Sequence, residues 1–174
     1  MTAGNRVPRR RIARRGQSLL EFTLSAVPVI FLLLSIVEMS RAMWVYVTLA
    51  HAIKEGTRFS VVHGADCVQA KPDCQITVNQ VAARIITAGM GLDSRKMNVV
   101  LQTAGATQTC APVSSCLDVA TAWPPSPDNS VGLPITISGT YPFSTAMAMF
   151  IPQSGSIKFG AMSFGATSQQ EIAF

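Results

Sequence analysis

The sequence has little charge and few aromatic side chains. Charged residues make up 13% and aromatic residues 7% of the 174 residues, whereas a typical soluble domain carries roughly 25% charged residues. Hydrophobic residues reach 48%, and the mean hydropathy is +0.33. This composition argues against a freely soluble cytoplasmic enzyme.

The chain also lacks the motifs that catalysis and metal binding require. It contains no glycine-rich phosphate loop and no nucleophile elbow. His51 and His63 lie 12 residues apart without a paired carboxylate arrangement. The spacing of the cysteines differs from the C-x2-4-C pattern usual for zinc. We therefore expect no enzymatic activity, no metal and no cofactor.

The first 16 residues contain no acid, although they hold six of the 14 basic residues of the chain. The remainder has eight basic and nine acidic residues, so the net charge of +5 comes from this short leader. The rest of the chain carries no excess of positive charge for a polyanion. We expect no nucleic-acid partner.

A long apolar run follows the basic leader. Leu19 to Val37 are 19 residues with one charge, Glu21. About 20 apolar residues in a helix span the ~30 Å hydrocarbon core of a bilayer. The arginines before this run place the N-terminus in the cytoplasm by the positive-inside rule. The sequence therefore predicts a single-pass protein of the membrane whose C-terminal part is exported.

A cleaved secretory signal is the alternative to a membrane anchor, but the nearest small-x-small site, Ser40-Arg41-Ala42, carries an arginine. The helical pattern also continues beyond this site up to Gly64. We expect one helix over residues 17–63. Its second half has a polar stripe of Arg41, Thr48, His51, Glu55 and Arg58, and an apolar face of Tyr46, Leu49, Ala50, Ile53, Thr57 and Val61.

Four cysteines form two close pairs, Cys67 with Cys74 and Cys110 with Cys116. An even number of paired cysteines favours disulfides over free thiols or a metal site, and disulfides form in an oxidising compartment. Four cysteines can pair in three ways, and the favoured pairing is the one that joins each cysteine to its near neighbour. This interpretation agrees with export of the C-terminal part.

The remaining pattern predicts an α+β fold with a small antiparallel sheet packed on the exported half of the long helix. The expected organisation is a leader (1–16), a membrane and projecting helix (17–63) and an exported domain (64–174). The expected elements are a loop over 65–73, a helix over 78–86 ended by Gly89 and Gly91, a strand over 96–102, a connection over 103–116, irregular chain over 123–129, a strand over 133–140 ended by Tyr141-Pro142-Phe143, and strands over 156–164 and 167–174.

Glu21 is the most informative residue, because a carboxylate in an apolar segment costs ~2.5–3.5 kcal/mol and usually has a partner. The stretch from Arg14 to Phe22 (RRGQSLLEF) resembles the type IV prepilin processing site. This resemblance implies cleavage between Gly16 and Gln17, with Glu21 neutralising the new amine of Gln17. The alternative is that Glu21 only snorkels to the cytoplasmic interface.

A longer stretch resembles the TadE-like family of tight-adherence pilus assembly proteins. The matching features are the R-x-G-x-x-x-x-E-F start, which includes Phe22, the E-x-x-R pair Glu38 and Arg41, and the segment Lys54-Glu55-Gly56-Thr57-Arg58, in which Thr57 replaces the usual alanine. Tyr141-Pro142-Phe143 and Glu171 match the end of the family pattern more loosely. Glu38 and Arg41 are also spaced as a simple surface ion pair.

The resemblance implies a minor pilin or pseudopilin that acts in assembly of a type IV-related pilus at the bacterial inner membrane. The implied partners are a prepilin peptidase, pilin-like subunits, inner-membrane platform proteins and membrane lipid. Two alternatives stay open. The chain could be an uncleaved, membrane-anchored scaffold of the same machine, or a membrane-anchored adhesive domain.

Overall fold

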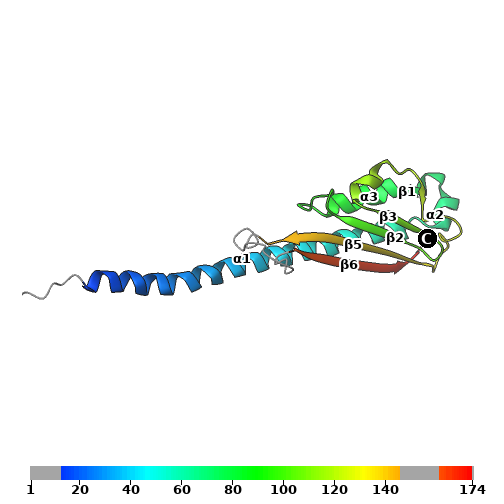
Figure 1. The fold of residues 1–174 in the computed structure, drawn as a ribbon. Coiled ribbons are helices and arrows are strands. Elements are labelled where there is room, and N and C mark those ends of the chain that lie inside the picture. The colour runs from blue at the N-terminus through cyan, green and yellow to red at the C-terminus, as the bar shows by residue number, and fades with distance from the viewer. Residues whose placement is uncertain (1–12, 146–160, 174) are drawn as a thin grey trace, which may run out of the picture. The chain divides into compact units, whose positions relative to one another are not determined.

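The computed structural model describes residues 13–145 and 161–173. They divide into two compact units with a boundary between Ser40 and Arg41. Helix α1 (Ala13–Val61) supplies the first unit and the beginning of the second, which also contains small antiparallel sheets and short helices (Figure 1). The predicted α+β class, with one long N-terminal helix, is confirmed.

The first unit consists of an apolar stretch of α1. Its large side chains are exposed, among them Leu20, Phe22 and Phe31. Its hydroxyl groups bond back to the helix: the Oγ atom of Ser35 donates to the carbonyl of Phe31 at 2.8 Å. Among the described residues, α1 is the one helix long and apolar enough to cross a membrane, with a mean hydropathy of 2.3 in its most apolar window.

The second unit buries one face of the remaining part of α1. The buried positions recur every three or four residues, as expected for a helix with one side in a core. They are Val45, Leu49, Ala52, Ile53, Gly56, Thr57, Ser60 and Val61. The expectation that Tyr46 lies on this face is wrong, because 46% of its surface is exposed. This part of α1 therefore belongs to the same compact unit as the sheet.

Four antiparallel strands form the main sheet in the order β3-β2-β5-β6. Their bounds are β2 Asn98–Gln102, β3 Thr107–Cys110, β5 Pro134–Ser144 and β6 Ala161–Glu171. The short strands β1 (Ile76–Thr77) and β4 (Ala122–Trp123) form a second, antiparallel pair. The remaining elements are α2 (Ala65–Ala70), α3 (Val78–Ala88) and the 3-10 segments η1 (Pro72–Cys74) and η2 (Val113–Asp118).

Two glycines let α1 approach its neighbours closely. A Cβ atom added to Gly56 of α1 would lie 2.5 Å from Cγ1 of Ile85 in α3. A Cβ atom added to Gly139 of β5 would lie 2.8 Å from Cγ1 of Ile53. The core therefore forms where α1 packs against α3 on one side and against the middle of β5 on the other.

Several predicted boundaries are wrong. The expected loop over 65–73 contains α2, and the connection over 103–116 contains β3 and η2. The strand predicted over 133–140 continues to Ser144, because β6 pairs with β5 as far as Ser144, whereas β2 pairs with it only as far as Thr140. Pro142 therefore lies where β5 has a described neighbour on one side only, and a missing N–H is tolerated there. A single strand, β6, replaces the two predicted near the C-terminus, and residues 156–160 and 174 lie outside the described residues.

Gly139→Ala is expected to destabilise the second unit by about 1–3 kcal/mol, because the added methyl group overpacks the contact with Ile53. Urea denaturation in detergent, followed by the fluorescence of the buried Trp123, measures the change. Gly165→Ala in β6 is the matched control, since its Cβ atom would meet only the carbonyl oxygen of Gly139, at 3.9 Å. Equal free energies of unfolding for the two variants would contradict this packing.

Candidate functional site: the N-terminal motif of α1

The proposed processing motif lies in the first turns of α1. Gly16 belongs to the helix, and Gln17 and Glu21 follow on one side of it, one turn apart. The Nε2 atom of Gln17 donates a hydrogen bond to Oε1 of Glu21 at 3.2 Å. Both side chains are exposed, and 72% of the neighbouring Phe22 is exposed. Residue 17 and the carboxylate of Glu21 are therefore within contact distance in the uncleaved chain.

Glu38 and Arg41 lie in adjacent turns of α1 at the boundary of the two units. Glu38 is half-buried, and Arg41 is the first residue of the second unit. The guanidinium carbon of Arg41 lies 5.5 Å from the centre of the Phe143 ring in β5. This distance is typical of a cation–π contact. The sequence identified Arg41 but gave no sign of Phe143 as its partner.

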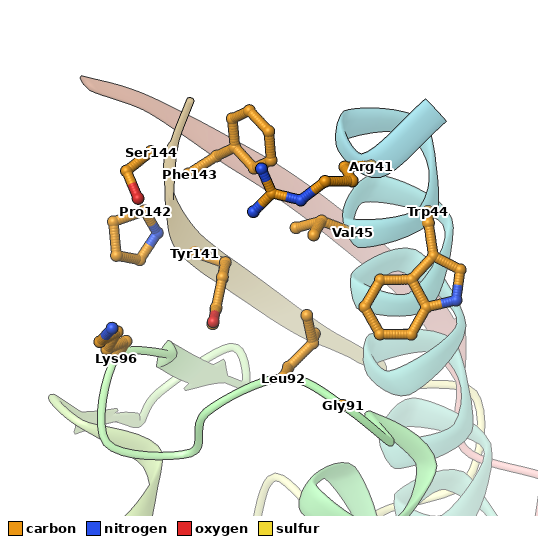
Figure 2. Close-up of a pocket in the computed structure, with 10 residues that line it drawn as sticks. All are labelled: Arg41, Trp44, Val45, Gly91, Leu92, Lys96, Tyr141, Pro142, Phe143 and Ser144. Carbon is orange, nitrogen blue, oxygen red and sulfur yellow. The ribbon is translucent and has the colours of Figure 1, made fainter. Parts of the chain in front are cut away.

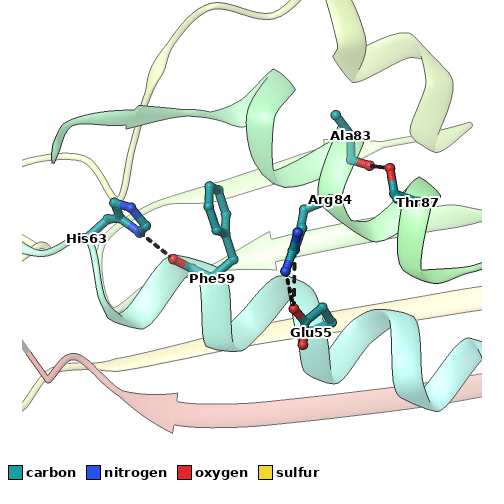
Figure 3. A network of polar contacts seen from close by, with 6 residues as sticks. All are labelled: Glu55, Phe59, His63, Ala83, Arg84 and Thr87. Carbon is teal, nitrogen blue, oxygen red and sulfur yellow. Dashed lines mark hydrogen bonds and ion pairs between the residues drawn. The ribbon is translucent and has the colours of Figure 1, made fainter. Parts of the chain in front are cut away.

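Glu55 contacts a residue that the sequence did not identify. Its Oε1 atom accepts hydrogen bonds from Nη2 of Arg84 in α3 at 2.6 Å and from Nε at 3.2 Å (Figure 3). The hydrogen bond from Arg84 lowers the pKa of Glu55 below its ordinary value, and the positive charges of Arg84, Arg58 and His51 act in the same direction. Arg58, which belongs to the same predicted polar stripe, is exposed.

The end of α1 is held by local contacts. The Nδ1 atom of His63 donates to the carbonyl oxygen of Phe59 at 2.6 Å, and the two rings lie 4.7 Å apart (Figure 3). This arrangement satisfies a carbonyl group in the last turn of the helix. The environment of His63 is thus that of a helix end, and His51 lies exposed three turns earlier.

Two disulfides link neighbouring short elements of the second unit. Cys67 of α2 is bonded to Cys74 of η1, with their Cα atoms 5.8 Å apart. Cys110 of β3 is bonded to Cys116 of η2, with their Cα atoms 5.6 Å apart. Each link closes a short loop beside the core, and Cys110 and Cys116 are themselves buried.

We expect mass mapping without reductant to find no free thiol and to recover these two links. Short loops of this kind stabilise a domain by about 2–3 kcal/mol each in the chain-entropy model. A Cys67→Ser, Cys74→Ser double variant compared with a Cys110→Ser, Cys116→Ser variant separates the two contributions. Alkylation of all four thiols in the non-reduced protein would contradict the disulfides.

Residues 16–58 match a family model described as TadE-like protein. Searches among curated proteins and among solved structures give no match. The matched segment begins at Gly16 and ends at Arg58, so it contains the N-terminal motif from Gly16 onward, the apolar part of α1 and the polar stripe. The TadE-like family is structural and associated with pili. Residues 16–58 of this chain are therefore similar to the TadE-like family, which is associated with the tight-adherence pilus.

Proposed function

We propose that this protein is a minor pilin or pseudopilin that acts in assembly of a tight-adherence pilus and is cleaved between Gly16 and Gln17 by a prepilin peptidase. The match to the TadE-like family, which starts at Gly16, is the observation that carries this proposal. The helix places Gln17 and Glu21 one turn apart and in contact, which supports a shared role for the two residues.

In this proposal the apolar stretch of α1 anchors the chain in the bacterial inner membrane. The arginine-rich leader, residues 1–16, stays in the cytoplasm by the positive-inside rule. The unit from Arg41 to Phe174 is exported, where an oxidising compartment maintains its two disulfides. The exposed apolar side chains of the anchor are available to membrane lipid and to the helices of other pilin-like subunits and platform proteins.

Cleavage gives Glu21 its function. Hydrolysis of the bond after Gly16 leaves an α-ammonium group on Gln17, at the entrance to an apolar segment. A charge there is costly without a partner. The carboxylate of Glu21, which accepts a hydrogen bond from the Gln17 side chain in the uncleaved chain, is one turn away and can neutralise the amine within its own chain or in a neighbouring subunit.

The mature N-terminus tests the proposal. The full chain is expressed in two otherwise identical strains, with and without the prepilin peptidase, and its intact mass is measured after extraction from membranes. We expect loss of residues 1–16 only in the strain with the peptidase. A full-length chain in both strains would contradict cleavage and favour the uncleaved scaffold.

A further inference from the structure

Strand β6 lies at one edge of the main sheet and lacks the features that usually protect an edge. It has 11 residues and is the last strand in the order β3-β2-β5-β6 (Figure 1). Natural edge strands are protected by charged side chains, prolines, bulges or short length. Residues 161–170 contain no charge and no proline, and the register between β5 and β6 runs without a bulge. The opposite edge, β3, is protected by its length of only four residues.

The register identifies the backbone groups of β6 that point away from β5. In an antiparallel pair, opposite residues that exchange hydrogen bonds alternate with opposite residues that do not. The N–H group of Ile172 donates to the carbonyl oxygen of Leu133 at 2.9 Å, so the even-numbered residues of β6 bond to β5. Pro134 agrees with this phase, because it lies opposite Glu171 and has no N–H group to donate. The residues with outward N–H and C=O groups are therefore Ser163, Gly165, Thr167, Gln169 and Glu171.

The outward side of β6 is open with respect to the part of the chain that the structure describes. Gly165 is exposed, and because it has no side chain its exposed surface is backbone. Within 4 Å, a Cβ atom added to it would meet only the carbonyl oxygen of Gly139, at 3.9 Å. The other four outward residues are exposed as well. A row of unpaired backbone donors and acceptors is complementary to the backbone of another extended strand.

We propose that the outer edge of β6 binds an extended, uncharged strand of a different exported subunit, which continues the sheet beyond β6. The backbone groups determine that the occupant is a strand. The lack of charge over residues 161–170 determines that the strand is uncharged, because a charge placed against this edge would lose water without gaining a partner. The inference rests on the proposed function only for the export of both partners and for the exclusion of a second copy.

The side chains beside the edge specify the partner further. On the face of the sheet that α1 covers, the ring of Phe164 lies 6.2 Å from that of Tyr46. Tyr46 keeps 46% of its surface exposed, and Met162, which is on the same face as Phe164, keeps 58%. An added strand would cover these groups with every second side chain. We therefore expect apolar side chains on that face of the partner strand, and polar ones on the other face, next to Thr167.

A second copy of this chain fits the edge less well. Within the second unit α1 and β6 run in the same direction. Arg41 lies beside Phe143, which is opposite Met162 (Figure 2), and at the other end the carbonyl oxygen of Val61 accepts from the N–H group of Ala173 at 3.0 Å. Two β6 strands paired antiparallel would thus place residue 41 of the two copies at opposite ends, about 30 Å apart along the helix. Copies anchored in one membrane need these ends on the same side, and a parallel pair is the less stable ladder.

Hydrogen exchange of the full-length protein in detergent, resolved to single amides by NMR, tests the edge. The probe is a peptide that copies residues 133–140 (LPITISGT), an uncharged segment in which apolar and polar side chains alternate. At a peptide concentration of about ten times its dissociation constant, exchange at Gly165, Thr167 and Gln169 should slow about tenfold, because only the free edge exchanges. The even-numbered amides of β6, which already bond to β5, should change little.

Thr167→Pro removes the central outward N–H group, and an edge strand tolerates proline at such a position. Thr167→Ala is the matched control. Both variants lose the contact between the hydroxyl groups of Thr167 and Ser138, at 3.1 Å, but alanine keeps the N–H group. We expect the slowing at Gly165 and Gln169 to fall to about threefold in Thr167→Pro, because loss of one hydrogen bond weakens binding about fivefold. It should stay about tenfold in Thr167→Ala.

Outward amides that do not slow with the peptide would overturn the proposal, and so would equal slowing in the two variants. Outward amides that are protected without peptide would also overturn it: protection that rises with protein concentration would assign the edge to a second copy, and constant protection would assign it to the chain itself. Fast exchange of the even-numbered amides in Thr167→Pro would report unfolding, and Gln169→Pro then replaces this variant. Because the measurement requires neither cleavage nor a membrane, these outcomes leave the proposed function intact.

Discussion

Gly16→Val is expected to accumulate as the full-length protein in the membrane, with processing reduced to a trace. A peptidase that cuts after residue 16 must approach the backbone closely at that position, and glycine is the residue that permits such an approach. A branched side chain both blocks this approach and stiffens the backbone. Intact mass and the ratio of full-length to shortened protein on a gel measure the effect.

Ala13→Val is the control for this variant. It adds similar bulk to the same first turns of α1, but three residues before the proposed bond, and its processing is expected to be normal. Unchanged processing of Gly16→Val in a strain that contains the peptidase would remove the cleavage step from the proposed function.

The long helix could be predicted from the sequence because its signals are local. The apolar run, the polar stripe and Gly64 all act within a few turns, and the structure ends α1 at Val61. The orientation of Tyr46 could not be derived in this way. Which residues at the margin of an amphipathic face are buried depends on the element that covers them. Tyr46 lies edge-on to Phe164 of β6, with ring centres 6.2 Å apart, and still keeps 46% of its surface exposed.

The sheet shows the limit of pattern reasoning more clearly. Proline after an alternating segment predicts the end of a strand, and Pro142 would end a central one. The end of β5 is set by the register of the sheet instead. Strand β5 is longer than β2, and beyond Thr140 its one described partner is β6. Strand lengths and neighbours are properties of the whole sheet, so they are not encoded in the residues around Pro142.

The same distinction applies to the candidate sites. The motif around Gly16 and Glu21 is short and continuous, so the sequence alone could propose it as a candidate site, and the family match begins there. The partners of Glu55 and Arg41 are Arg84 and Phe143, which lie in α3 and β5. Their proximity follows from the packing of those elements on α1, and the only signal in the sequence was the position of Arg84 on the polar side of a short helix.

Glu21→Gln is expected to give normal amounts of protein in the membrane but few or no pili. The amide keeps the size and much of the hydrogen bonding of the carboxylate, including an acceptor for the Gln17 side chain. Insertion becomes slightly easier, because a neutral amide costs less in hydrocarbon than a carboxylate. Processing is expected to continue, since the scissile bond lies more than a turn away.

Assembly is the step that should fail in this variant. The new ammonium group of Gln17 enters an apolar contact between subunits, and removing the partner of a buried charge costs on the order of 3–5 kcal/mol. This cost corresponds to a fall in association of more than about a hundredfold, since each 1.4 kcal/mol is a factor of ten. Glu21→Asp retains the charge and should restore some pili, which separates charge pairing from side-chain shape. Pili are counted by electron microscopy at matched expression. Normal piliation of Glu21→Gln would mean that Glu21 only snorkels to the interface, because an unpaired amine in the contact between subunits would prevent assembly.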